Sequence, residues 1–183
     1  MVSREFATAL ADDAQVQGKP LYYVANDVVK VYLKARQRGY DLEEVIESYE
    51  AMDTLRKMGF TLISEAFLES ITSDITPENA LIYESICEKT GRSFGMFAKS
   101  SFGTPKEAMN KFSRLFSDIH FHFSTEGEKD ILYVACPGKS TIRASLIARM
   151  MKGFLDGFDF ISHQTVVIEG LVKIEYSKRS LFH

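Results

Sequence analysis

The chain has 183 residues, 45% hydrophobic and 26% charged, and its 22 basic and 25 acidic side chains give a net charge of −3. This composition is typical of a soluble globular protein of about one domain, and the slight acidity gives no general electrostatic reason to bind nucleic acid. No apolar run approaches the roughly 20 residues of a membrane span, and the first residues lack the apolar core of a secretion signal. We therefore expect a cytoplasmic protein without a membrane span.

Charge is unevenly distributed along the chain. Residues 41–88 carry 2 basic and 12 acidic side chains, whereas residues 89–183 carry 14 basic and 9 acidic ones. This distribution predicts one acidic helical surface and a mildly basic second half.

The first helices are indicated by capping residues and glycine stops. Asn26-Asp27 precede an amphipathic stretch that runs to Gly39, and Asp41 with Glu44 forms an aspartate version of a capping box. The helix after Asp41 is expected to end at Gly59. A further short helix is expected over residues 60–71.

Two Thr-Pro pairs predict the next helix starts, because proline suits the first position of a helix and threonine can cap it. Thr76-Pro77 opens the longest predicted helix, about residues 77–100, and Thr104-Pro105 opens the following one. Residues 1–116 are therefore expected to be mainly helical.

After residue 117 the hydrophobic period shortens to two, which is typical of strands. Residues 118–125 and 130–136 are expected to form one hairpin, and Glu169-Gly170 joins two further predicted strands. A helix is expected between the hairpins, from Ser140 or Thr141 to about residue 156. The sequence thus predicts a single α+β domain over 1–183, in which residues 117–183 form a four-stranded antiparallel sheet in β-β-α-β-β order.

Three short motifs fit this order. They are the Gly91 and Gly95 pair in Thr90-Gly91-Arg92-Ser93-Phe94-Gly95, the helix end Gly153-Phe154-Leu155-Asp156-Gly157, and Arg114-Leu115-Phe116 before the first strand. With them, residues 60–177 resemble the superfamily of vinyl-4-reductase domains, small subunits of the TRAPP vesicle-tethering complex and haem nitric-oxide sensing domains. The resemblance implies a domain that encloses an apolar ligand or pairs with a partner through its helices.

The resemblance does not extend to a cofactor. The haem-binding members use a histidine on a helix and a Tyr-x-Ser-x-Arg motif, but here all four histidines follow the helical half and Tyr176-Ser177-Lys178-Arg179 has its serine one place early. Some TRAPP subunits carry an acylated cysteine, and no local motif transfers that role to Cys87. The cofactor is therefore unknown from the sequence.

The histidines and cysteines offer an alternative, a metal-dependent enzyme. His120 and His122 are two apart on a predicted strand and share a face, so that they could chelate a metal if His163 came near. Cys136 could join them as an accessible thiol. The plainer interpretation is a pair of solvated histidines and an inert cysteine at a strand end.

The segment Cys136-Pro137-Gly138-Lys139-Ser140-Thr141 lies between a strand and a helix, where a phosphate-binding loop would belong. A complete motif needs a glycine at the position of Tyr133. An anion at the helix start, near Lys139 and Arg143, remains an option. We favour a helix cap with a solvated lysine.

A ligand pocket is predicted between the two longest helices of the second part of the chain. Gly91 and Gly95 lie one turn apart, and we expect close approach of a neighbouring element to offset their low helix propensity. The same residues would form an ordinary core if the helices closed fully. The expected lining residues are Ile86, Phe94, Phe97, Leu146, Met150 and Phe154.

The sequence therefore favours a non-catalytic ligand-binding or regulatory module, such as a sensor or signalling domain, over a metal-dependent enzyme or a purely structural adaptor. The binding partners we expect are a small apolar ligand, a second copy of the chain or another protein. A homodimer is expected because two helices present more apolar surface than one small sheet can cover. Their apolar stripes consist of Tyr23, Val24, Val28, Val31, Tyr32 and Ala35, and of Val45, Tyr49, Met52 and Leu55.

Overall fold

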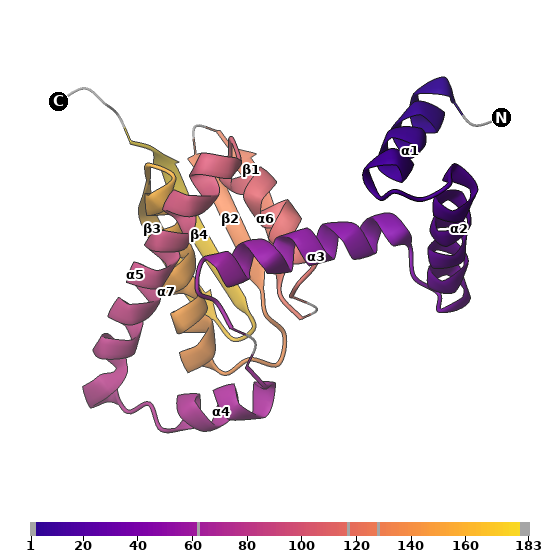
Figure 1. The fold of residues 1–183 in the computed structure, drawn as a ribbon. Coiled ribbons are helices and arrows are strands. Elements are labelled where there is room, and N and C mark those ends of the chain that lie inside the picture. The colour runs from indigo at the N-terminus through magenta and orange to yellow at the C-terminus, as the bar shows by residue number, and fades with distance from the viewer. Residues whose placement is uncertain (1–2, 62, 117, 128, 180–183) are drawn as a thin grey trace. The chain divides into compact units, whose positions relative to one another are not determined.

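The computed structural model describes residues 3–61, 63–116, 118–127 and 129–179. The chain falls into two compact units, residues 1–49 and 50–183. The expectation of a single domain stays a prediction. The α+β class is confirmed, with helices first and the strands after them (Figure 1). No helix in the described ranges is long and apolar enough to cross a membrane.

The first unit contains α1 (Arg4–Val16), α2 (Leu21–Gln37) and the first turns of α3 (Leu42–Lys57). Helix α2 begins earlier than expected, so that Asn26 and Asp27 lie inside it. Pro20 occupies its N-cap position with φ −59°. The ring fixes that angle near the helical value, and nothing in the following residues breaks the helix, which explains the earlier start.

Helix α3 has the predicted cap and the predicted end. Asp41 Oδ1 accepts hydrogen bonds from the backbone N–H of Glu43 and Glu44, at 2.9 and 3.4 Å. The helix stops two residues before Gly59, which has a φ of +83°. Side chains rarely adopt that conformation, so glycine suits the turn out of the helix.

The second unit continues with α4 (Glu65–Ser73), α5 (Pro77–Ser101) and α6 (Pro105–Ser113). Both Thr-Pro starts are confirmed. At α6, Thr104 Oγ1 accepts from the N–H of Glu107 at 3.2 Å, and the Glu107 carboxylate accepts from the N–H of Thr104 at 3.1 Å. Helix α4 begins later than expected, because Ser64 caps it.

The sheet has the predicted composition. Its strands are β1 (His120–Glu126), β2 (Lys129–Ala135), β3 (Phe160–Ile168) and β4 (Leu171–Lys178), and α7 (Thr141–Gly157) lies between the hairpins in the chain. The spatial order is β1-β2-β4-β3, and every neighbouring pair is antiparallel. The β-β-α-β-β expectation is confirmed.

Helices α5 and α7 approach each other through glycines on both sides. A Cβ at Gly91 would overlap the carbonyl oxygen of Met150, and a Cβ at Gly153 would overlap that of Glu88. Gly95 and Gly157 repeat this relation one turn along. The expected close approach at Gly91 and Gly95 is therefore confirmed.

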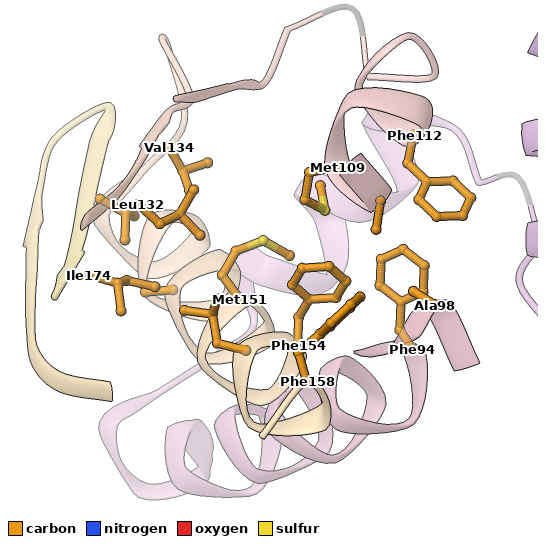
Figure 2. Close-up of a cluster of buried hydrophobic side chains, with 14 of the residues drawn as sticks. Phe94, Ala98, Met109, Phe112, Leu132, Val134, Met151, Phe154, Phe158 and Ile174 are labelled. Atoms are coloured by element: carbon orange, nitrogen blue, oxygen red, sulfur yellow. The ribbon is translucent and has the colours of Figure 1, made fainter. Parts of the chain in front are cut away.

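The core of the second unit lies between the sheet and the helices. Helix α7 packs against β3 and β4, α6 against β1, and α5 against α7. In Figure 2, Phe94, Phe112 and Phe154 gather at one end of this core, and side chains of β2 and β4 lie at the other. Phe94 is central, with ring centroids 5.0 Å from Phe112 and 5.1 Å from Phe154.

Candidate functional site

An apolar pocket of about 400 Å³ lies within the second unit. Its walls come from the last turns of α3, the loop after α3, the middle of α5, the turn after α6, and α7. Its volume lies in the usual range for small-molecule sites. The lining residues are Met52, Leu55, Arg56, Phe60, Thr61, Phe94, Leu115, Phe116 and Met150.

The first wall is built by the turn that ends α3. The N–H of Phe60 donates to the carbonyl of Leu55 at 3.0 Å, a bond that Gly59 makes accessible through its positive φ. This bond turns the chain back along the helix. The ring of Phe60 then meets that of Phe94 edge to face, with centroids 5.7 Å apart.

The opposite wall is held by α5, α7 and the turn after α6. Phe94, only 2% exposed, forms its deepest part. The close contact of Gly91 with the Met150 backbone fixes α7 beside α5 at this level. Leu115 and Phe116 follow α6 in a tight turn, in which their N–H groups donate to Phe112 and Ser113 at 2.9 and 3.1 Å.

The pocket has two polar lining residues, Arg56 and Thr61, and no acidic one. Arg56 lies in the last turn of α3 with an exposed side chain. The arrangement is that of an apolar cavity with a single cation at its rim. It can bind and orient a small molecule, and its lining side chains include no nucleophile next to a base.

The pocket contains two of the six residues expected to line it, Phe94 and Met150. Leu146 lies at another, smaller hollow. Phe154 is fully buried in the core, whereas Ile86 and Phe97 are 54% and 37% exposed. Ile86 and Phe94 therefore do not share an environment, although they lie eight residues apart on one helix.

Sequence reasoning did not assign Arg56, Phe60, Thr61, Leu115 or Phe116 to the pocket. Met52 and Leu55 carried a signal, because they belong to the apolar stripe of the α3 region. On sequence alone, that stripe favours a surface for self-association. In the structure its last two members line the pocket.

The four residues of the metal-enzyme alternative are not brought together. His120 and His122 lie on β1, and His163 lies on β3 at the opposite edge of the sheet, about 14 Å away at the usual strand spacing. Cys136 is fully buried, which raises the pKa of its thiol, so the alternative of an accessible thiol is wrong and the favoured interpretation of an inert cysteine agrees with the structure. Residues 3–61, 63–116, 118–127 and 129–179 hold no cluster of three His, Cys, Asp or Glu residues suited to a metal. His183 lies outside those ranges.

The start of α7 holds an ion-pair network. Ser140 caps the helix as expected, accepting from the N–H of Arg143 at 3.3 Å. Lys139, however, is 8% exposed and pairs with Glu65 and Asp118, so the expectation of a solvated lysine is wrong. Burial is tolerated here because both carboxylates neutralise the ammonium.

Glu65 links the two cations of this network, because it also pairs with Arg143. Hydrogen bonds from Arg143 and Lys139 lower the pKa of Glu65 to about 2. Carboxylates of the chain itself therefore occupy the anion position considered at this helix start.

Cys87 is half-buried on α5, and burial raises the pKa of its thiol. A raised pKa keeps the thiol protonated and unreactive at neutral pH. This placement agrees with a packing role.

Comparison of the sequence and structure with family models, curated proteins and solved structures gives no match.

Proposed function

We propose that this chain is a binding module that encloses a small apolar molecule in the pocket between α3, α5 and α7. The observation that carries the proposal is the pocket itself, about 400 Å³ with seven apolar side chains among its nine lining residues. Concave apolar surface of this kind favours transfer of an apolar molecule out of water. The superfamily resemblance implies the same type of site.

The first experiment is extraction of small molecules from the purified full-length protein, followed by mass spectrometry. A pocket variant is then compared with a matched control. Leu115→Trp fills the pocket, whereas Leu81→Trp places the same ring on α5 at a position that is 71% exposed. We expect Leu115→Trp to abolish binding of the extracted molecule, or of 1-octanol if none is extracted, and Leu81→Trp to retain it. Equal binding by both variants would show that the ligand binds outside this pocket. Absence of binding by the wild type would refute the proposal.

We also propose that the first unit mediates association of two copies of the chain. Among its described residues only Ala14 and Val24 are buried hydrophobics, yet 14 of the 25 exposed large apolar side chains in the described ranges belong to it. A unit of this length with so few buried apolar side chains is only marginally stable alone. An exposed apolar surface of this extent is typical of an interaction site.

A groove in this unit offers a place for the second copy. It has a volume of about 450 Å³ and is lined mainly by apolar side chains of α2 and α3, including Val28, Val31 and Ile46. Residues 1–49 carry 6 basic and 8 acidic side chains, so two copies meet with little net repulsion. The proposed role of this module is sensing or regulation. The proposed location is the cytoplasm, because both cysteines are free thiols and cytoplasmic thiols stay reduced.

The test of association is the molar mass in solution, measured by light scattering on the full-length protein. Val31→Glu buries a charge in the proposed interface, and Gln37→Glu adds the same charge at the end of α2. We expect a dimer for the wild type and Gln37→Glu, and a monomer for Val31→Glu. A monomeric wild type at micromolar concentration would refute the dimer.

A further inference from the structure

Arg56 is the one charged residue that lines the pocket, and it belongs to a part of the sequence that is mostly acidic. Residues 41–88 contain 12 acidic side chains and only two basic ones, Arg56 and Lys57. Lys57 forms an ion pair with Asp53 at 2.7 Å. The Arg56 side chain forms no ion pair or hydrogen bond with any residue in the described ranges, and Arg56 is the residue that lines the pocket.

The neighbouring carboxylates are already engaged with other cations. Asp53 pairs with Lys57, and Glu50, on the same helix, pairs with Lys111 at 2.8 Å. The guanidinium of Arg56 is therefore available, at the rim of an apolar cavity without an acidic lining residue. Its forked N–H donors match the geometry of a carboxylate, and nearby apolar walls strengthen such a pair by reducing contact with water.

We infer that the ligand of this pocket is an amphipathic carboxylic acid, whose apolar body lies against Phe60, Phe94 and Met150 and whose carboxylate pairs with Arg56. This inference rests on the proposed function, since it names the class of molecule that the pocket takes. Arg56 is the one cation among the lining residues, and a single guanidinium balances one negative charge better than the two of a phosphate monoester dianion.

The experiment compares two probes of equal chain length, octanoate and 1-octanol, by calorimetric titration of the full-length protein at neutral pH. We expect octanoate to bind the wild type about tenfold more tightly than 1-octanol, because hydrogen bonds to charged groups add affinity. Arg56→Gln should remove this preference, so that the variant binds octanoate and 1-octanol with about equal affinity. Lys57→Gln, which removes the neighbouring cation on the same turn, should keep the preference.

The outcomes separate the inference from the proposed function. Equal affinity of the wild type for both probes, or an unchanged preference in Arg56→Gln, would overturn the carboxylate inference and leave the apolar pocket in place. Binding of neither probe would remove the proposed pocket function together with the inference. The comparison of the two probes on the wild type needs no variant to fold.

Discussion

Gly91 lies directly against the carbonyl group of Met150, so that the backbones of α5 and α7 touch without an intervening side chain. Reciprocal contacts at Gly153, Gly95 and Gly157 extend this interface over two turns. Glycine is normally unfavourable inside a helix by about 1 kcal/mol relative to alanine. Here the dense helix contact offsets that cost.

The first prediction concerns this contact. Gly91→Ala should lower the free energy of unfolding by roughly 1–3 kcal/mol, because the new methyl group meets rigid backbone and the helices must separate. Ser93→Ala, at an exposed position of the same helix, should leave stability unchanged or slightly raised. Urea unfolding curves measure both. A Gly91→Ala variant more stable than the wild type would show that the helices are not packed in this way.

The second prediction concerns Glu65 in the network at the start of α7. Its folded-state pKa of about 2 lies below the ordinary 4.5, because Arg143 and Lys139 stabilise the carboxylate. The contribution of Glu65 to stability is therefore present above pH 4.5 and is lost as the pH falls toward 2. Glu65→Gln should remove this part of the acid dependence, which thermal unfolding as a function of pH measures.

Glu169→Gln is the control for that prediction. Glu169 is an exposed carboxylate in the turn between β3 and β4. Its substitution should leave the acid dependence of the wild type intact. Identical acid profiles for the Glu65 and Glu169 variants would show that the network does not stabilise the fold.

The third prediction concerns Tyr176 on β4, which is 6% exposed. Burial, assisted by the negative charge of Asp130, raises the pKa of Tyr176 to about 12 from 10.0. The folded state holds the phenolic proton more tightly than the unfolded state does. The stabilisation is therefore complete below pH 10 and is lost as the pH rises toward 12.

Tyr176→Phe isolates this effect, because it keeps the ring that packs against Phe160 at a centroid distance of 5.3 Å. Between these pH values the wild type should lose roughly 2–3 kcal/mol relative to the variant. Unfolding by urea at mildly and strongly alkaline pH measures the difference. An equal loss of stability in the wild type and in Tyr176→Phe would show that the Tyr176 hydroxyl is exposed to water in the folded protein.

Features that depend on neighbouring residues in the chain were predictable. The Thr104-Pro105 start of α6 is a local capping signal, and β1 to β4 follow from the period of two. The start of α2 was misplaced because Asn26 and Asp27 carry a capping signal that the surrounding helix overrides. Several residues near a helix start can act as caps, and the sequence alone does not show which of them the tertiary packing favours.

The pocket could be predicted only in part, because its walls come from distant segments. Phe94 and Met150 were identified from helix periodicity, whereas Leu55 and Leu115 meet them only through the tertiary fold. The burial of Lys139 has the same origin. It depends on Glu65 and Asp118, which lie 74 and 21 positions away and supply the compensating charge.

The glycine contacts also determine which walls of the pocket can change in evolution without loss of the fold. Phe94 and Met150 belong to helices locked backbone to backbone, so substitutions there disturb the interface that holds the second unit together. Met52, Leu55, Leu115 and Phe116 line the same cavity from outside that interface, and all are partly exposed. Substitutions that reshape the pocket are therefore expected at these four positions, with the glycines kept.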